Sequence, residues 1–391
     1  MYPNLYYLLK DLFHIDLPFL KVVNMFGLCV AVSFLLCAWT LVKEFKRREA
    51  LGQFTYEEKE ITVGEPASMT ELILNFVLGF VVGYKLLGIF FTDGAMANPQ
   101  AFLFSSNGNF LTGAVLGVVF LYVKWKEKNK TKLDKPEKKT IKIWPSDRVG
   151  DMVIISAVGG FAGAKVFDNL ENWNRFIEDP IGNLLSPSGL TFYGGLIVAS
   201  IALYYYFRRH NMSFIRVADA IAPGLMLAYG SGRIGCHVAG DGDWGIVNTH
   251  PKPFAWIPDW FWCYDYPHNV NKEGVPIPNC TWDDYCNHLS QGVFPTPLYE
   301  IIVCIGLFFF LWAIRKKINV PGKLFGIYLF LNGLERELIE QIRVNTKYDI
   351  FGFHPTQAEI IAFLLMIGGL LLIWKSKVWF KPYQSPVVSG Q

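Results

Sequence analysis

The sequence is poor in charged residues. Asp, Glu, Lys and Arg make up 18% of its 391 residues, whereas hydrophobic residues make up 52%. This balance excludes an ordinary soluble globular domain and is typical of a chain that crosses a membrane several times. The sequence also lacks a coarse internal repeat, a low-complexity tract and the N-terminal features of a cleavable signal peptide. Its net charge of +3 gives no indication of nucleic-acid binding.

Long apolar segments recur along the chain. A transmembrane helix needs about 20 mostly apolar residues, and one of the candidate segments is interrupted by glycine, proline and charge. We predict an all-α polytopic membrane protein with about nine transmembrane helices. The predicted spans cover residues 19–42, 71–92, 110–124, 151–168, 190–207, 217–236, 298–314, 323–342 and 357–375.

The placement of basic residues predicts the topology. Lys and Arg cluster in alternate loops, and positively charged loops remain on the cytoplasmic side. Nine spans with the N-terminus outside and the C-terminus inside put every cluster on that side. The longest outer loop is then residues 237–297, about 60 residues. The basic clusters cover residues 43–48, 124–148, 208–216, 315–323 and 375–382.

The seven cysteines fall into two groups. Three of them are in the middle of predicted spans, where they are expected to pack as small apolar side chains: Cys29, Cys37 and Cys304. Four others lie on the outer, oxidising side and allow three disulfide pairings: Cys236, Cys263, Cys280 and Cys286.

Several predicted spans carry ionisable residues, which are costly at membrane depth and therefore indicate function. Lys165 and Asp168 are three residues apart, a spacing suited to a structural ion pair. The eighth predicted span contains "GLERELIEQIR", in which Arg336, Glu340 and Arg343 share one helical face. The same segment also contains Glu335 and Glu337. We predict that this charged stripe forms a functional site with Arg233.

The segment "GSGRIGCHVAGDGDWG" (230–245) combines Arg233 with glycines and acidic residues at the outer end of the sixth predicted span. Guanidinium groups bind phosphate with two parallel hydrogen bonds and keep their charge. Glycines allow backbone N–H groups to approach the same anion. The segment therefore indicates a pocket for the phosphate of a lipid headgroup, reached from the bilayer. A third element is "TFYGGL" (191–196), where Tyr193 can face a polar cavity or the glycines can serve helix packing.

These segments, in this order, resemble the prolipoprotein diacylglyceryl transferase family. The family signature "GRxGNFxNxELxG" corresponds to "GRIGCHVAGDGDWG" (232–245), "SFHGGL" to "TFYGGL", and "HPSQLYE" to "FPTPLYE" (294–300). An Arg, Glu and Arg in one span correspond to Arg336, Glu340 and Arg343. Weaker matches are "GAKVFDNL" (163–170), "NMFGL" (24–28) and "HPTQ" (354–357). The resemblance covers about residues 19–45 and 150–376.

The family has seven spans, so the resemblance implies that two of the nine, within 71–124, form an inserted hairpin. The expected organisation is an N-terminal segment and first span (1–48), the insertion with a basic cytoplasmic loop (49–149), and a transferase-like core (150–391).

The resemblance implies a multi-pass enzyme of the bacterial cytoplasmic (inner) membrane that uses no cofactor and no metal. Such an enzyme transfers a diacylglyceryl group from phosphatidylglycerol to the lipobox cysteine of a prolipoprotein, so these two substrates and the surrounding membrane lipids are the expected partners. The implied catalytic residues are Tyr193, Arg233 and Arg336, and His237 is a further catalytic candidate that the family pattern does not include. The implied substrate-binding residues are Gly194, Gly195, Arg233, Asp241, Asp243, Glu300, Glu340 and Arg343.

The departures from the family pattern concern activation of the thiol. Tyr193 replaces the family histidine, and a tyrosine with an ordinary pKa near 10 is a poor base. Cys236 and Ala239 replace two asparagines, Asp241 or Asp243 replaces the glutamate, and Phe26 replaces a tyrosine. His237 is absent from the family pattern, and we predict that it can replace the missing base.

Three other interpretations remain open at this stage. His237, Asp241 and Asp243 can form a metal site completed by His250 or His268, although alternating Gly and Asp are also common in turns. Polar, glycine-rich spans are also found in membrane transporters. Finally, the changes at Tyr193 and Cys236 are compatible with an accessory, lipid-binding paralogue that has lost the transferase activity.

Overall fold

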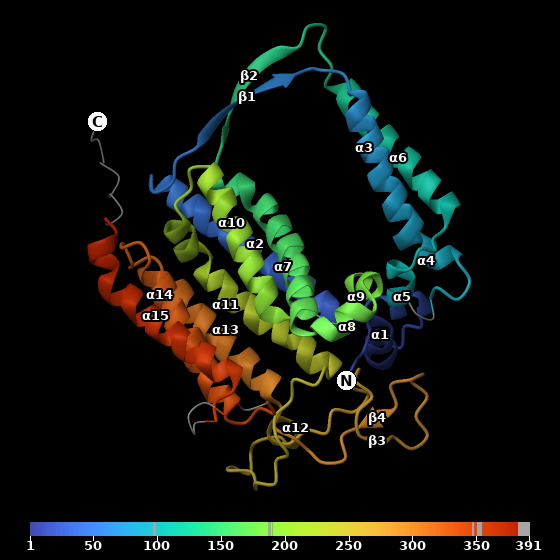
Figure 1. Cartoon of the computed structure of the whole chain (residues 1–391), viewed down its shortest axis with the longest axis vertical. Coiled ribbons are helices and arrows are strands. Elements are labelled where there is room, and N and C mark those ends of the chain that lie inside the picture. The colour runs from blue at the N-terminus through green and yellow to red at the C-terminus, as the bar shows by residue number, and fades with distance from the viewer. Residues whose placement is uncertain (97–98, 187–188, 190, 346–347, 350–353, 382–391) are drawn as a thin grey trace. The chain divides into compact units, whose positions relative to one another are not determined.

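The computed structural model describes residues 1–96, 99–186, 189, 191–345, 348–349 and 354–381. The described chain forms two compact units. The first unit comprises residues 1–55, 145–150 and 207–391, and the second comprises residues 56–144 and 151–206. Figure 1 shows the elements of both units in chain order.

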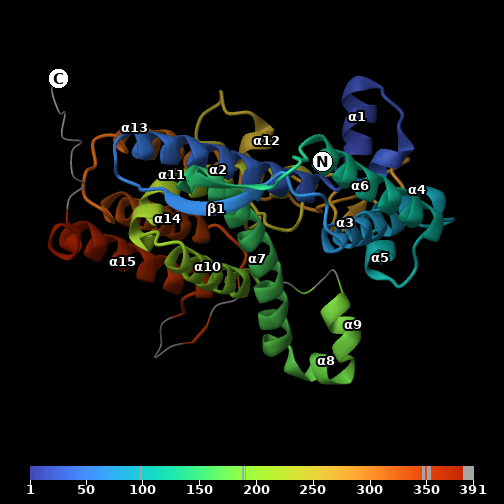
Figure 2. The same ribbon diagram turned by 90° about the horizontal axis from the view of Figure 1, so that it is seen from above.

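The first unit is a helical bundle built around α11 (Phe214–Ala239). This helix packs against α2 (Met25–Ala50), α13 (Thr296–Ile314) and α14 (Lys323–Glu340), and α14 packs against α15 (Gln357–Trp379). Figures 1 and 2 both show α14 and α15 side by side. Asn24 caps the start of α2, and Thr356 forms a capping box with Glu359 at the start of α15.

Glycines let α11 approach its neighbours closely. A Cβ atom on Gly224 would lie 2.5 Å from Oγ1 of Thr40, and one on Gly235 would lie 2.9 Å from Cβ of Cys29. Both neighbours belong to α2, so these glycines set the distance between the two helices. Pro223 lies inside α11 without ending it, so the sixth predicted span is one continuous helix and the expectation of a broken span was wrong.

Asp219 has a structural role in the bundle. It is buried at 1% exposure. Its two carboxylate oxygens accept hydrogen bonds from the backbone N–H groups of Gly322 (2.7 Å) and Phe325 (2.8 Å). Backbone N–H groups at the start of a helix have no partner within that helix. Asp219, a residue of α11, therefore caps α14.

Short elements cover the end of the bundle at which α11 ends and α13 begins. They include α1 (Leu5–Phe13), η1 (Pro18–Val22), α12 (Asp259–Trp262) and the antiparallel pair β3 (Val275–Pro276) and β4 (Asn287–His288). Cys280 and Cys286 form a disulfide, while Cys236 and Cys263 are free thiols. These four cysteines therefore form one disulfide, whereas each of the three predicted pairings contained two.

The second unit contains two helical hairpins and a two-stranded ribbon. Strands β1 (Glu57–Val63) and β2 (Glu137–Ile143) pair antiparallel. Beyond the ribbon, α3 (Met69–Val82), η2 (Gly83–Leu87) and α4 (Gly88–Phe91) pack against α6 (Phe110–Lys130), with α5 (Pro99–Phe104) in the connection. The ribbon was not predicted, because its strands are short and rich in Lys and Glu.

The other hairpin of this unit follows η3 (Pro145–Arg148), which belongs to the first unit together with the start of α7. It consists of α7 (Val149–Glu171), α8 (Trp173–Glu178), α9 (Pro180–Leu185) and α10 (Phe192–Arg209). Within α7, both Lys165 and Asp168 are buried. Asp168 forms an ion pair with Arg175 at 2.7 Å, and Lys165 donates to the carbonyl of Gly189 at 3.4 Å.

Each of the nine predicted spans overlaps a helix of the described chain, although the bounds differ at several ends, and residue 190 lies outside the described residues. Within the described residues, five helical segments are long and apolar enough to cross a membrane: Met25–Ala50, Met69–Phe91, Pro145–Glu171, Thr296–Ile314 and Gln357–Trp379. The fold is therefore that of a mostly helical, multi-pass membrane protein.

Candidate functional site

Glu300 is the centre of a cluster of buried charges at the start of α13. Its side chain is fully buried. Nε of Arg233 lies 2.9 Å from Oε2 of Glu300, and Nη1 of Arg336 lies 3.3 Å from Oε1. Nη1 of Arg343 lies 3.8 Å from Oε2, and the Tyr229 hydroxyl donates a 2.9 Å hydrogen bond to Oε1. Because a buried charge without partners is strongly destabilising, Glu300 and these arginines depend on one another.

Arg336 and Glu340 form the ion pair that their spacing predicts. Nη2 of Arg336 lies 2.9 Å from Oε2 of Glu340, one helical turn further along α14. Oε1 of Glu340 accepts a 2.8 Å hydrogen bond from Oγ1 of Thr356 and another from the Asn345 amide. Since Thr356 also caps α15, Glu340 connects Arg336 to the start of the next helix.

Arg343 reaches the cluster from outside the helix. The predicted helical face included Arg343, but α14 ends at Glu340, so that part of the prediction was wrong. The chain turns after Glu340, and Arg343 pairs with the backbone of Gly245 in an isolated bridge. Its Nη2 lies 2.5 Å from Oδ1 of Asp243. Backbone pairing therefore positions this arginine.

Asp243 joins two of the arginines across the turn that follows α11. Gly240 (φ 64°) ends α11 in the left-handed conformation, and Gly242 (φ 96°) lies just before Asp243. Asp243 binds Arg233 through one oxygen and Arg343 through the other. Burial raises the pKa of Asp243, but the two guanidinium groups outweigh burial and hold that pKa below its ordinary value.

Asp241 does not bind an arginine directly in this arrangement. Its Oδ1 accepts a 3.3 Å hydrogen bond from the backbone N–H of Asp243. Burial, and then the nearby charge of Asp243, raise the pKa of Asp241. Of the two aspartates predicted to orient the arginine, the structure therefore places Asp243 in that position.

The cluster combines fixed positive charge with unused donors. Three arginines are paired with three carboxylates, those of Asp243, Glu300 and Glu340. In the described part of the chain, Nε and Nη1 of Arg343 are buried and have no hydrogen-bond partner. Guanidinium groups with free donors in a buried position bind phosphate or carboxylate oxygens strongly. The arrangement is therefore suited to a small oxyanion.

Glu335 is an additional carboxyl beside this cluster. It is 6% exposed, and neither oxygen has a hydrogen-bond partner among the described residues. Three charged groups lie near it: Glu300, Arg233 and Arg336. Glu335 therefore differs from Asp243, Glu300 and Glu340, whose carboxylates are paired with arginines.

The structure tests the metal interpretation directly. Cys236, Asp241 and Asp243 have possible ligand atoms within 4.8 Å of one another, but His237 is not part of this group. Nη1 of Arg233 lies 3.6 Å from Sγ of Cys236 and also contacts Asp243. A guanidinium group thus neutralises the position that a metal ion would take, and the residues do not fit a metal.

His237 lies among aromatic rings at the end of α11. Its Nδ1 is 3.4 Å from the hydroxyl oxygen of Tyr266, and its ring is 6.1 Å from that of Tyr264. His237 follows Arg233 by four residues, so both side chains project from the same side of α11. The structure therefore places His237 one turn beyond Arg233, near the C-terminal end of α11.

Tyr193, Gly194 and Gly195 are in α10 of the second unit. Tyr193 is half-buried. A Cβ atom on Gly194 or on Gly195 would lie 2.7 Å from a backbone carbonyl oxygen of α7. Both glycines therefore serve the close packing of α7 and α10, and a substrate-binding role for these three residues remains a prediction.

Sequence reasoning missed three residues that complete the charged cluster: Tyr229, Asn345 and Thr356. Tyr229 precedes Arg233 by four residues, and its ring centre lies 5.4 Å from Cζ of that arginine. The helical spacing of Tyr229 and Arg233 was a usable signal. Asn345 and Thr356 had no such signal, because both reach Glu340 from outside α14.

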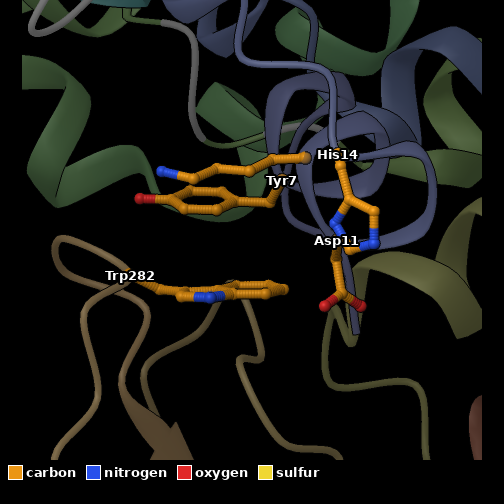
Figure 3. Close-up of a pocket in the computed structure, with 5 residues that line it drawn as sticks. Tyr7, Asp11, His14 and Trp282 are labelled. Carbon is orange, nitrogen blue, oxygen red and sulfur yellow. The ribbon is translucent and has the colours of Figure 1, made fainter.

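A separate hollow of about 240 Å³ lies beside α1. Its lining consists of Tyr7, Lys10, Asp11, His14 and Trp282. Figure 3 shows the ring of Tyr7 stacked on that of Trp282, with Asp11 and His14 to one side. The Tyr7 and Trp282 centroids are 4.5 Å apart, and His268 stacks on Trp282 at 4.0 Å. Both faces of Trp282 are therefore covered. The hollow lies where α1 packs against the loop that the Cys280–Cys286 disulfide closes.

Comparison with known proteins gives a consistent result. Residues 111–375 match the model of a family described as prolipoprotein diacylglyceryl transferase. Three relatives bear the name phosphatidylglycerol–prolipoprotein diacylglyceryl transferase. The relative from Leptospira interrogans is 26% identical over 289 residues, covering 60% of this chain and 81% of the relative.

The relative from Aliivibrio fischeri (strain MJ11) is 30% identical over 240 residues, which cover 60% of this chain and 74% of the relative. The relative from Vibrio vulnificus is 28% identical over 264 residues, which cover 66% of this chain and 84% of the relative. The family match includes all the residues of the charged cluster.

Proposed function

The chain belongs to the prolipoprotein diacylglyceryl transferase family, and we propose that it transfers a diacylglyceryl group from phosphatidylglycerol to a prolipoprotein. The acceptor is the thiol of the lipobox cysteine. In this reaction a C–S bond forms at the glycerol carbon while the C–O bond to phosphate breaks. The phosphate oxygen retains the electron pair, glycerol phosphate leaves, and the thiol proton passes to a base.

The observation that carries this proposal is the group of three arginines around Glu300. The breaking C–O bond leaves a second negative charge on the phosphate, and preorganised cations stabilise such developing charge. Arg233 and Arg336 lie on two helices that flank Glu300, so they bind the phosphate from two sides. Arg343 adds the free donors described above.

The carboxylates of the cluster position these arginines. Glu300 and Glu340 are buried and hold Arg233 and Arg336 by the ion pairs given above. Asp243 has a side chain that is 33% exposed, and it is the carboxylate that a lipid phosphate displaces from Arg233 and Arg343. The free cluster therefore keeps its arginines charged and oriented until the anionic substrate binds.

The thiol-activating half of the site uses His237, with Tyr193 as a hydrogen-bond donor to the substrate. His237 is one helical turn from Arg233 and has no acidic partner among its described hydrogen bonds. A histidine of this kind can accept a proton from a thiol, and the thiolate is the nucleophile. Asp241 and the glycines Gly194 and Gly195 complete the proposed substrate-binding set.

The proposed setting is a bacterial cytoplasmic membrane. Nine spans with the N-terminus outside and the C-terminus inside are supported by the positions of the basic clusters and by helices that overlap the predicted spans. In this topology the charged cluster lies at the outer end of α11 and α13, where a lipobox cysteine outside the membrane reaches a lipid headgroup.

The test is an in vitro transfer assay. Purified protein in detergent receives labelled phosphatidylglycerol and a lipobox peptide, and the thioether product is measured. We expect product from the wild type and none from Arg233→Ala or Arg336→Ala. Arg47→Ala is the matched control, because Arg47 also pairs with a buried glutamate, Glu44, but in a different cluster. Bound lipid without product would instead indicate an accessory paralogue.

A further inference from the structure

Residues 250–262, here called the aromatic loop, expose large aromatic side chains within the outer segment of the first unit. The exposed fractions are 59% for Phe254, 78% for Trp256 and 53% for Trp260. The rings of Phe254 and Trp256 stack with centroids 5.9 Å apart. Three large aromatic side chains exposed in one short segment indicate an interaction surface.

The loop is an ordered structure, because its two ends are tied together. Nε1 of Trp262 donates a 2.9 Å hydrogen bond to the carbonyl of His250, and the Asn248 amide donates to the carbonyl of Trp262 over 2.7 Å. Nζ of Lys252 lies 2.6 Å from Oδ1 of Asp259. The exposure of the aromatic side chains is therefore a property of a folded loop.

The base of the loop rests on the first turn of α13. The Tyr299 hydroxyl donates a 2.8 Å hydrogen bond to the carbonyl of Phe261, and the two rings are 5.3 Å apart. Trp262 packs against Phe294 at 5.4 Å. Figure 1 shows α12, which contains Phe261 and Trp262, at the end of the bundle where α13 begins. The loop is therefore attached where a membrane span starts.

The apolar surface continues from the loop onto α13. This helix is one of the five long enough and apolar enough to span a membrane. Just beyond Tyr299, Ile302 is 52% and Val303 45% exposed. These two residues face the lipid if α13 spans the membrane, so the exposed rings lie next to a lipid-facing surface.

The composition of the loop matches the region of lipid headgroups. Tryptophan concentrates at membrane–water interfaces, where the ring is in a partly apolar environment and the N–H group finds polar partners. The charges of Lys252 and Asp259 neutralise each other, so the attraction depends on the rings and little on salt.

We propose that the aromatic loop is inserted in the headgroup region of the lipid leaflet in which α13 begins. In the topology given above, this is the outer leaflet. Tyr299 is followed directly by Glu300, so the loop holds the entrance of the charged cluster at the level of the lipid phosphates. The inference rests on α13 crossing the membrane and not on the transferase reaction.

The test uses the full-length protein in phosphatidylcholine–phosphatidylglycerol nanodiscs. Tryptophan emission is recorded with lipids brominated near the headgroup end of the acyl chain, with unbrominated lipids, and with iodide in the water. The chain has 12 tryptophans, so the emission of the loop is obtained as the difference between the wild type and Trp256→Phe/Trp260→Phe. Trp282→Phe is the matched control, because Trp282 is stacked between Tyr7 and His268 in the same outer segment.

We expect the difference emission of the double variant to be quenched by the brominated lipid and protected from iodide. The Trp282 difference is expected to be insensitive to bromine. Difference emission that iodide quenches and bromine does not would place the loop in water and overturn the proposal. Protection that requires an added signal peptide would overturn it as well, since the occupant would then be the protein substrate. Thermal unfolding of both variants near the wild-type temperature verifies that they fold.

Discussion

Arg233 and Glu300 join two helices through a buried ion pair, with Nε of the arginine 2.9 Å from Oε2 of the glutamate. The same carboxylate also faces Arg336 and Arg343. One fully buried glutamate is thus shared by three arginines that come from α11, α14 and the turn after α14. The pairing makes the site and the bundle depend on the same residue.

Glu300→Gln is expected to remove both activity and stability. The amide has the shape of the carboxylate but leaves three guanidinium groups without their common anion. Removing one member of a buried ion pair lowers the free energy of unfolding by about 3–5 kcal/mol. Arginines that are no longer held in place also bind the lipid phosphate less well. Thermal unfolding in detergent and the transfer assay measure the two effects. A variant with the wild-type unfolding temperature would contradict the shared role of Glu300.

Glu335→Gln is the matched comparison and is expected to behave differently. Glu335 is buried beside the same arginines, but neither oxygen has a hydrogen-bond partner among the described residues. The amide therefore keeps the shape of a carboxyl that is not paired with an arginine among the described residues. We expect the free energy of unfolding of the variant to be within about 0.5 kcal/mol of the wild-type value, or slightly higher. Transfer activity should be retained. A large loss of stability would show that Glu335 is ionised and paired.

Asp243→Asn is expected to strengthen the binding of anions. The substitution removes the carboxylate that occupies Arg233 and Arg343 in the free protein, so a phosphate no longer competes with it. The KM for phosphatidylglycerol and the inhibition constant of glycerol phosphate should both fall, by up to about tenfold for one such charge-assisted contact. Steady-state kinetics with added glycerol phosphate provide the measurement. An increase in both constants would mean that Asp243 orients the arginines without competing for them.

His237→Gln and Tyr193→Phe separate the two candidates for the thiol half of the site. If His237 is the base, its loss lowers kcat/KM about 10²–10⁴-fold, whereas Tyr193→Phe removes one hydrogen bond and has a small effect. The transfer assay at several pH values checks this. Tyr193→His provides the reciprocal test, since it restores the family residue and should rescue activity in the His237→Gln background.

The stability of the outer segment is expected to fall in mild acid because of His268. Burial lowers the pKa of His268 below its ordinary value near 6.5, although the hydrogen bond to the Tyr285 carbonyl partly opposes this. The unfolded chain therefore binds the proton first as the pH falls, so stability is complete above about 6.5 and decreases below it. Thermal unfolding between pH 8 and pH 5 measures the slope. The dependence of the unfolding temperature on pH should be weaker for His268→Gln. An unchanged dependence would mean that other groups cause the loss of stability in acid.

The sequence predicted the spans and the charged helix because those signals are local. Apolar length defines a membrane helix, and the spacing of Arg336 and Glu340 defines a helical pair. Glu300 was expected in the site from its motif, although nothing local indicated that it is fully buried. Its burial follows from the packing of α11, α13 and α14 around it.

What could not be predicted depends on turns and on contacts distant in sequence. Arg343 was expected on the helical face, but the helix ends three residues earlier and backbone pairing with Gly245 positions it. The disulfide was one of several possible combinations, and only the loop geometry brings Cys280 to Cys286. Asp219 is an ionisable residue in the sixth predicted span, but its partners are the backbone N–H groups of another helix, which no local pattern indicates.

The cap that Asp219 provides fixes the start of α14, at the opposite end of this helix from the charged cluster. It thereby fixes the direction in which Arg336 projects. Arg336 lies about 20 Å along the helix from the start that Asp219 holds. A single residue inserted between Lys323 and Arg336 would leave that start in place and rotate everything beyond it by about 100°. Arg336 would then face away from Glu300. Insertions and deletions inside α14 are therefore expected to separate Arg336 from Glu300 even where the helix itself remains intact.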